Sequence, residues 1–384
     1  MQHYIRKHTE SLKKAGWHRE LRDFEPLDAT HYLYNGKKVT IFASNNYLGL
    51  TFDKRVIEAN IAATQRYGTG SGGSRLTTGS HVYHAALEKK LAKYKNTEAA
   101  LVFSSGYLAN IGVISAIFDK TSVIFGDDDN HASIRDGIRL SGAKYYEYRT
   151  CDTVHLEKLL KKHRDEGKLA LIVTDSIFSM QGNAAPLQDI AKLAKKYDCA
   201  TMADEAHALG VLGTHGRGLV NKLGLEKEID IQMGTFSKAI GAVGGYIAGS
   251  AELIDWLKNR ARSFVYDTSL PAGDIAAILA SLDILESDET VTKRLWENID
   301  YFKTHYRGEY HPTETGIFAL PCPDIEGAMA ASRRLLDEHA IWIPAIRPPT
   351  VKRPILRLII TASHTREEID ELIAALDKVL VKSE

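Results

Sequence analysis

The chain has 384 residues, 44% hydrophobic and 26% charged, which is ordinary for a soluble globular protein of about two or three domains. Its 49 basic and 49 acidic residues balance, so charge gives no reason to expect nucleic acid or an anionic membrane as a partner. Three widely spaced cysteines lack metal-ligand spacing, so no metal is expected, and their low count suits a reducing compartment. Residues 1–14 are polar, and no run approaches the roughly 18 apolar residues of a membrane span. We therefore expect a cytoplasmic protein.

Short apolar runs alternate with helical patterns over most of the chain. Residues 1–44 are expected to form an N-terminal helix and an arm that ends in a strand at 37–44. Buried strands are predicted at residues 99–103, 122–125, 169–173, 200–203 and 229–233, with helices such as 107–118 and 187–197 between them. This alternation predicts an α/β domain over residues 45–270, with a mainly parallel sheet covered on both faces. Ligands of such sheets collect beyond the carboxyl ends of the strands.

The pattern changes near residue 270. A long helical stretch is predicted over residues 273–306, without an obvious buried strand. It is followed by short apolar runs at 316–320, 341–343 and 355–360 and by a closing helix at 365–381. These elements predict a smaller α+β domain over residues 271–384.

Lys238 follows the buried run at residues 229–233 and precedes a glycine-rich stretch. A lysine in this place suits a carbonyl-bearing cofactor, although most lysines are simply solvated at the surface. Asp204 follows another apolar strand, where it is either a helix N-cap or an anion facing a pyridine nitrogen. A Schiff-base lysine and a carboxylate on two strand ends are the parts that a pyridoxal phosphate (PLP) enzyme needs. His207 would then be a hydrogen-bonding partner or a proton carrier near the reacting carbon.

Other polar residues also follow predicted strands. Ser105, just before the helix that starts near Tyr107, is either an ordinary N-cap or part of a phosphate site. His131 is either structural or lies flat against a planar cofactor, and Ser179 either caps a turn or binds a cofactor oxygen. The glycine-rich segment at residues 68–80 is either a flexible loop or a contact site for an anion.

Arg357 lies within the apolar run at residues 355–360. Burial of an arginine without a partner is costly, so the guanidinium must find an anion. That anion is either a structural carboxylate of the chain or the carboxylate of an amino-acid substrate, held by two parallel hydrogen bonds.

Taken together, several motifs resemble those of the α-oxoamine synthases. In chain order they are Asn45-Asn-Tyr-Leu-Gly49, Gly70-Ser-Gly-Gly-Ser-Arg75, Ser105-Gly-Tyr107, His131, Asp204-Glu-Ala-His207 and Thr235-Phe-Ser-Lys238. The resemblance implies the aspartate aminotransferase-like fold type I of PLP-dependent transferases, with a mainly parallel seven-stranded sheet in the large domain. It also implies decarboxylative condensation of an amino acid with an acyl thioester, at active sites shared between the subunits of a homodimer.

Two segments bear on the substrates. The loop around residues 70–76 and the segment 343–351 are most similar to those of members that join L-alanine to pimeloyl-CoA or pimeloyl-acyl carrier protein in biotin synthesis. Members that join glycine to acetyl-CoA are the alternative. Ser237 stands where the family often has glycine, and Asp267 replaces a more usual serine, which puts a phosphate contact there in doubt.

The resemblance implies a role for each matching residue. Lys238 anchors the cofactor and removes the α-proton, Asp204 pairs with the ring nitrogen, and His131 stacks on the ring. The other implied cofactor contacts are Ser105, Gly106, Tyr107, Ser179, His207, Thr235 and, reaching the neighbouring subunit, Thr268. The implied substrate contacts are Arg22 for the acyl group, Arg357 for the alanine carboxylate, and Asn45 and Thr350.

The sequence disfavours two rival interpretations. A catalytically silent homologue would lack the lysine or the aspartate, and both are present. An α/β dehydrogenase would carry a Gly-x-Gly-x-x-Gly fingerprint after its first strand, and the chain has none there.

Overall fold

The computed structural model of the protein describes residues 1–380, which divide into two compact units. The larger unit comprises residues 45–179 and 183–293; the smaller comprises 1–44, 180–182 and the described residues from 294 onward. The expected boundary lay near residue 270, but residues 271–293 pack with the larger unit. They do so because α11 (Ala272–Ser287) lies along α2 (Lys54–Tyr67), where Gly273 leaves no room for a Cβ against Thr64.

A seven-stranded, mainly parallel sheet forms the centre of the larger unit, as predicted. Its order is β4 (Ala99–Phe103), β10 (Gly245–Gly249), β9 (Ile231–Thr235), β8 (Ala200–Asp204), β7 (Ala170–Asp175), β5 (Val123–Asp127) and β6 (Lys144–Tyr148). Only β10 runs antiparallel to its neighbours. The central strands are apolar and buried on both faces because helices cover both sides.

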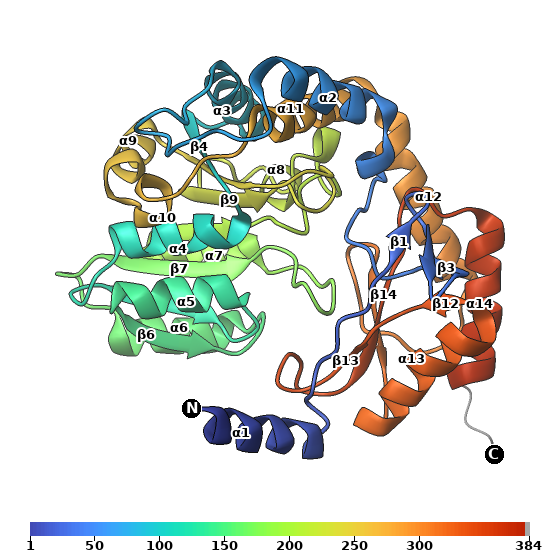
Figure 1. Ribbon diagram of the computed structural model, residues 1–384. Coiled ribbons are helices and arrows are strands. Elements are labelled where there is room, and N and C mark those ends of the chain that lie inside the picture. The colour runs from blue at the N-terminus through green and yellow to red at the C-terminus, as the bar shows by residue number, and fades with distance from the viewer. Residues whose placement is uncertain (381–384) are drawn as a thin grey trace. The chain divides into compact units, whose positions relative to one another are not determined.

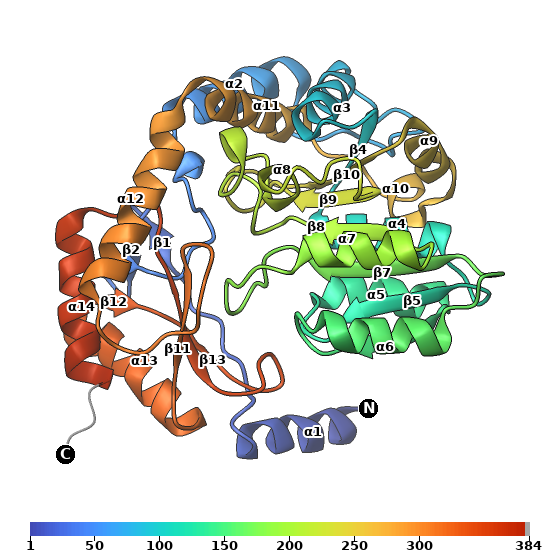
Figure 2. The same ribbon diagram turned by 180° about the vertical axis from the view of Figure 1, so that it is seen from behind.

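Helices α4 (Gly106–Ile117) and α5 (Ala132–Ser141) pack together on one face of this sheet, in front in Figure 1. Helices α6 (Thr153–His163) and α7 (Leu187–Lys196) lie on the other face (Figure 2). The remaining elements of the unit are η1 (Leu50–Phe52), α3 (Val82–Lys95), η2 (Thr214–Gly216), α8 (Leu219–Lys222), α9 (Ala251–Arg260) and α10 (Arg262–Val265). Leucine, isoleucine and phenylalanine side chains fill the core, and each contributes roughly 1.5–3 kcal/mol when fully buried.

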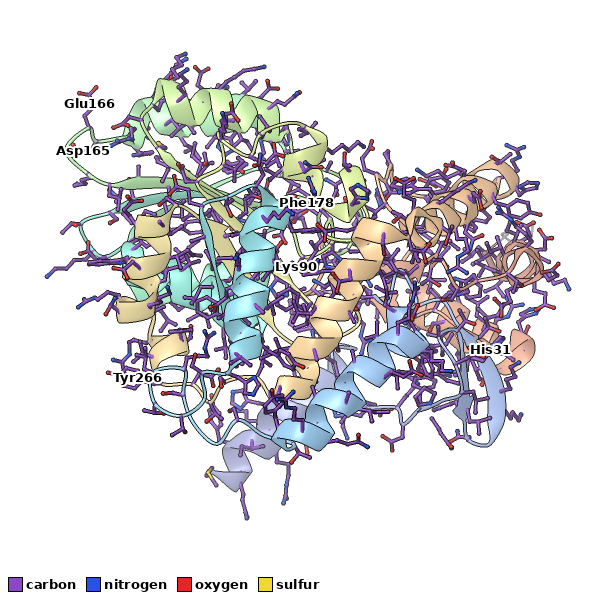
Figure 3. The ribbon with its side chains drawn as sticks, turned by 90° about the horizontal axis from the view of Figure 1, so that it is seen from above. His31, Lys90, Asp165, Glu166, Phe178 and Tyr266 are labelled. Atoms are coloured by element: carbon purple, nitrogen blue, oxygen red, sulfur yellow. The ribbon has the colours of Figure 1, made fainter. Side chains whose placement is uncertain are left out.

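Helix α3 is also tied to α11 by charge. The Nζ atom of Lys90, labelled in Figure 3, lies 2.6 Å from Asp283 Oδ1 and 2.5 Å from Glu286 Oε2. Helices α2, α3 and α11 therefore form one packed group within the larger unit.

The smaller unit contains two sheets. Strands β1 (Glu25–Pro26), β2 (His31–Tyr34), β3 (Lys37–Ile41) and β12 (Ile341–Trp342) form one, and β11 (Ile317–Pro321), β14 (Ile355–Ile359) and β13 (Ala345–Ile346) form the other. Its helices are α1 (Gln2–Lys14), α13 (Ile325–His339), α14 (Arg366–Leu380) and most of α12 (Glu289–His305).

The single helix predicted over residues 273–306 is two helices, α11 and α12. They separate at Asp288, whose Oδ1 accepts hydrogen bonds from the amide and the hydroxyl of Thr290. An aspartate that bonds the backbone two residues on competes with helix continuation and starts a new helix instead. Among residues 1–380, none of the helices combines the length and apolarity needed to cross a bilayer.

Candidate active site

Strands β7, β8 and β9 are parallel neighbours, so their carboxyl ends meet at one edge of the sheet. Asp175 and Asp204 are paired in register at the ends of β7 and β8. Lys238 follows β9 by three residues, and its charge acts on Asp175 and His131. The structure therefore brings together Lys238, Asp204 and His131, which come from three distant stretches of the sequence.

Asp204 is buried, with 2% of its surface exposed. Its Oδ1 accepts the backbone N–H of Ala206 at 2.9 Å, and its Oδ2 accepts the side-chain N–H of Asn110 at 2.8 Å. The same Asn110 nitrogen lies 2.8 Å from Ser133 Oγ, which lies 2.7 Å from His131 Nδ1. A continuous chain of polar side chains thus joins Asp204 to His131.

His131 stands at the start of α5 and caps it, because its Nδ1 accepts the N–H of Ser133. Its own backbone N–H donates to Asp175 Oδ2 at 2.7 Å. Partial burial lowers the pKa of His131, nearby Asp204 opposes this shift, and Lys238 adds to it. The ring of Tyr107 lies edge-on to the imidazole, with centroids 6.2 Å apart. Because part of His131 remains exposed, a flat ligand has access to it.

Asp175 is a site residue that sequence reasoning missed. It is buried, and burial together with the neighbouring Asp204 raises the pKa of its carboxyl well above the usual range. A signal was available, since Asp175 lies two residues after the predicted buried strand at 169–173, much as Asp204 follows the one at 200–203. Its partner, the amide of His131, was not visible without the structure.

His207 is held by a second missed residue, Tyr47. The Tyr47 hydroxyl lies 2.6 Å from His207 Nδ1 and also donates to Asn45 Oδ1 at 3.3 Å. Tyr47 is buried and belongs to the Asn-Asn-Tyr-Leu-Gly motif, in which only Asn45 had been selected. Asn45, Tyr47 and His207 therefore form one group in the larger unit.

The beginning of α4 is closely packed against β9 and β10. Ser105 caps the helix by accepting the N–H of Leu108 at 3.1 Å. A Cβ on Gly106 would lie 3.0 Å from Thr235 Cβ, and a Cβ on Gly245 would lie 2.6 Å from the Gly106 nitrogen. The first amides of a helix lack intrahelical acceptors, so the start of α4 is a place where an anion can bind.

Thr235, predicted to contact the cofactor, is engaged in the turn before Lys238. Its hydroxyl donates to the Gly244 carbonyl at 2.8 Å and lies 2.8 Å from Ser237 Oγ. Its single proton is therefore used within the protein. Ser179, another predicted contact, lies partly buried in the turn that follows β7.

The glycine-rich segment 68–80 is an ordered loop. Ser71 Oγ donates to the Ser269 carbonyl at 2.8 Å, and Ser74 forms a β-bridge with Thr268. Arg75 makes a two-point ion pair with Glu88, so its guanidinium has a structural use. Thr268 itself is exposed beside this loop.

The remaining predicted residues lie in the smaller unit. Arg357 is buried in the middle of β14, opposite Ala319 of β11. The guanidinium of Arg22 lies 4.6 Å from the centre of the Trp342 ring, at a cavity of about 310 Å³ that Arg333 and Arg347 also line. Thr350 accepts a hydrogen bond from Arg19 at 3.0 Å. Their roles toward substrates stay predictions.

The donor set of the larger unit fits PLP. It offers a lysine for a Schiff base, a buried carboxylate for a ring nitrogen, an accessible imidazole and a capped helix start for a phosphate. The described residues hold no cluster of three metal-ligating side chains.

A profile of class I and II aminotransferases matches residues 37–376. The chain belongs to this aminotransferase family. Within the family it is 42% identical to 8-amino-7-oxononanoate synthase of Thermoanaerobacter pseudethanolicus, over 98% of this chain and 96% of that one. It is 43% identical to the enzyme of the same name from Symbiobacterium thermophilum, over 96% and 95%.

Solved structures of family members have the same fold. A structure of SPT (serine palmitoyltransferase) with PLP internal aldimine superposes with a TM-score of 0.91 at 30% identity, covering 98% of both chains. The 8-amino-7-oxononanoate synthase of Francisella tularensis superposes with a TM-score of 0.77 at 29% identity, covering 89% of this chain and 98% of that one. The prediction of PLP-dependent fold type I is thereby confirmed.

Proposed function

We propose that the protein is an 8-amino-7-oxononanoate synthase. It would condense L-alanine with pimeloyl-CoA or pimeloyl-acyl carrier protein, forming a bond between the alanine α-carbon and the acyl carbonyl carbon while the thiol and carbon dioxide leave. The observation that carries the proposal is the meeting of Lys238, Asp204 and His131 at the ends of adjacent parallel strands. The names of the relatives support the choice of reaction.

Bound PLP supplies an electron sink for negative charge that develops at the substrate α-carbon. Lys238 Nζ anchors the cofactor and afterwards carries the α-proton away from and back to the carbon. Asp204 holds a proton at the ring nitrogen, since a buried carboxylate favours a cationic partner. The first amides of α4 bind the phosphate, and His131 covers the ring.

The remaining assignments of cofactor and substrate contacts come from the sequence. His207, which Tyr47 positions, and Ser179 contact the region of the phenolic oxygen on the cofactor ring. Arg357 binds the alanine carboxylate, Arg22 the acyl group, and Asn45 and Thr350 assist. The alternative is a glycine C-acetyltransferase, which would use glycine and acetyl-CoA.

The deciding experiment measures thiol release by the purified holoenzyme. L-Alanine, glycine and L-serine are each paired with pimeloyl-CoA, acetyl-CoA and palmitoyl-CoA, with pimeloyl-acyl carrier protein as a separate arm. We expect kcat/KM to favour alanine over glycine by about tenfold or more, because one methyl group in a pocket is worth roughly 1–3 kcal/mol. Turnover restricted to glycine with acetyl-CoA would establish the alternative.

Replacing the anchor lysine tests the assignment of the site. Lys238→Ala should abolish turnover and the yellow colour that borohydride bleaches, because no Schiff base with the protein can form. Lys222→Ala, a lysine of α8 in the same unit, is the matched control. Wild-type turnover by Lys238→Ala is incompatible with the proposal.

We also propose a cytoplasmic homodimer with shared active sites, in which Thr268 reaches the phosphate of the neighbouring subunit. The exposure of Thr268 beside the ordered glycine-rich loop supports this role. Light scattering should give twice the chain mass of 42.6 kDa. A monomeric mass in active enzyme would contradict the shared site.

A further inference from the structure

The polar chain between Asp204 and His131 has a fixed direction. A carboxylate oxygen only accepts hydrogen bonds, so the Asn110 group 2.8 Å from Asp204 Oδ2 must be the amide nitrogen. That nitrogen carries two hydrogens, and the second points at Ser133 Oγ, also 2.8 Å away. Asn110 thus donates in both directions, and Asp204 sets its orientation.

Ser133 Oγ accepts one hydrogen bond from Asn110, and its hydroxyl has one hydrogen to donate. Its hydroxyl lies 2.7 Å from His131 Nδ1, and this distance alone allows a donor on either atom. The backbone N–H of Ser133 faces the same Nδ1 at 3.3 Å, and an amide nitrogen cannot accept a hydrogen bond. This N–H therefore makes Nδ1 an acceptor, so the Ser133 hydroxyl also donates to it and the ring proton sits on Nε2.

Burial makes this arrangement specific. Asn110 and Ser133 expose 1% and 0% of their surfaces, so water does not compete for their hydrogen bonds. Asn110 Oδ1 has no hydrogen-bond partner among residues 1–380, so this amide serves only as a donor. Both side-chain N–H groups of Asn110 donate hydrogen bonds, while its carbonyl oxygen accepts none from the described residues.

We propose that Asn110 and Ser133 are positioning residues that transmit the orientation set by Asp204 to His131 and hold its imidazole neutral, in the Nε2–H tautomer. This inference rests on the proposed function, in which His131 covers the cofactor ring. A neutral imidazole adds no third positive charge beside Lys238 and the protonated nitrogen of the cofactor ring. Its Nε2–H remains a donor for an oxygen of the bound substrate.

Other charged groups also face His131 and must be considered. Asp204 on β8 favours the imidazolium, Lys238 after β9 disfavours it, and Asp175 on β7 accepts the His131 backbone N–H. Tyr107 on α4 lies edge-on to the ring, with its hydroxyl bonded to Asp136. The hydroxyl and the backbone N–H of Ser133 both face Nδ1, so the tautomer depends on Ser133.

The test compares Ser133→Ala with Ser141→Ala, a serine of the same helix whose hydroxyl donates to the Ile138 carbonyl. Holoenzyme with ¹⁵N-labelled histidine reports the tautomer of His131, assigned by the loss of its signal in His131→Asn. Wild type and Ser141→Ala should show Nε2–H at neutral pH. Ser133→Ala should show mixed tautomers, and its imidazolium should appear about half to one pH unit higher.

The acid limb of the pH profile of kcat should move to higher pH by the same amount, because His131 is protonated more easily once Nδ1 has lost a donor. Asn110→Asp provides a second route, because a carboxyl oxygen in place of the amide N–H would accept a hydrogen bond from the Ser133 hydroxyl and so release His131. Unchanged His131 shifts and an unchanged acid limb in both variants overturn the proposal. The nitrogen shifts test the tautomer even if no substrate pair is turned over, so this failure is distinct from failure of the proposed function.

Discussion

Glu205 follows Asp204 directly but serves a different purpose. Its carboxylate pairs with Lys95 and accepts the Val220 N–H at 2.9 Å. Gly218 passes so close that a Cβ there would lie 2.5 Å from both carboxylate oxygens. Glu205 is fully buried and Lys95 nearly so, so the pair fastens the segment that follows β8 to the end of α3. The strand end that carries Asp204 is thus held in place by the contacts of the next residue, Glu205.

Removing one member of this pair should be costly. Lys95→Met should destabilise the protein by about 3–5 kcal/mol, because it leaves the Glu205 charge buried and unpaired. The double variant Lys95→Met/Glu205→Gln should recover part of the loss, since no charge is left. Urea unfolding measures both free energies.

The exposed pair Arg334–Glu338 provides the control for that measurement. Arg334→Ala should change stability by less than about 1 kcal/mol, because solvent screens exposed ion pairs. If Lys95→Met cost no more than Arg334→Ala, the buried pair would not be the anchor described above.

At the residue scale, sequence alone selected Lys238 and Asp204 as candidates for chemistry, but it did not connect Asp204 to His131 through the residues between them. Lys238 and Asp204 could be selected because a charged residue at the end of an apolar strand is unusual. Asn110 lies with Tyr107 in the helix that follows Ser105, and the sequence pattern groups it with that helix start and not with Asp204. Its importance arises from Ser133 and Asp204, 23 and 94 positions away in the chain. Such contacts depend on tertiary packing, which no local spacing encodes.

At the element scale, hydrophobic pattern predicted the buried parallel strands and missed β6 and β10. Strand β6 is an edge strand with one neighbour and is partly exposed. Its sequence, Lys-Tyr-Tyr-Glu-Tyr, therefore lacks the continuous apolar run that marks a buried strand. Strand β10 begins and ends with glycine, which weakens the strand signal. Gly245 is needed because the start of α4 approaches its backbone closely.

That close approach makes β10 sensitive to one methyl group. Gly245→Ala would place a Cβ 2.6 Å from the nitrogen and Cα of Gly106, so helix α4 must shift. We expect a loss of about 1–3 kcal/mol in stability and weaker PLP binding, because the amides at the start of α4 move. Gly167→Ala, whose Cβ would meet only Asp165 at 3.6 Å, should change neither quantity. Equal PLP affinity in both variants would argue against a phosphate site at α4.

At the scale of the whole molecule, each compact unit encloses a buried histidine. His364 in the smaller unit stacks on Phe42 with ring centroids 4.1 Å apart, and burial lowers its pKa to about 4. In the larger unit, burial lowers the pKa of His84 to about 3, and the charges of Arg75 and His81 add to the shift. Both histidines are therefore neutral in the folded chain at neutral pH. Acid should weaken both units for the same reason.

The sign of this effect follows from proton binding. An unfolded histidine has a pKa near 6.5, so below that pH the unfolded chain binds protons that the folded chain excludes. The stability contributed by neutral His364 is complete above pH 6.5 and is lost as the pH falls to about 4, by up to about 3 kcal/mol. His364→Gln should be less stable at pH 7.5, because it loses the contact with Phe42, yet should lose less on acidification. Urea unfolding at intervals between pH 7.5 and 4 compares the slopes, with the exposed His3→Gln as control. Parallel curves for wild type and His364→Gln would show that His364 does not govern the acid sensitivity of its unit.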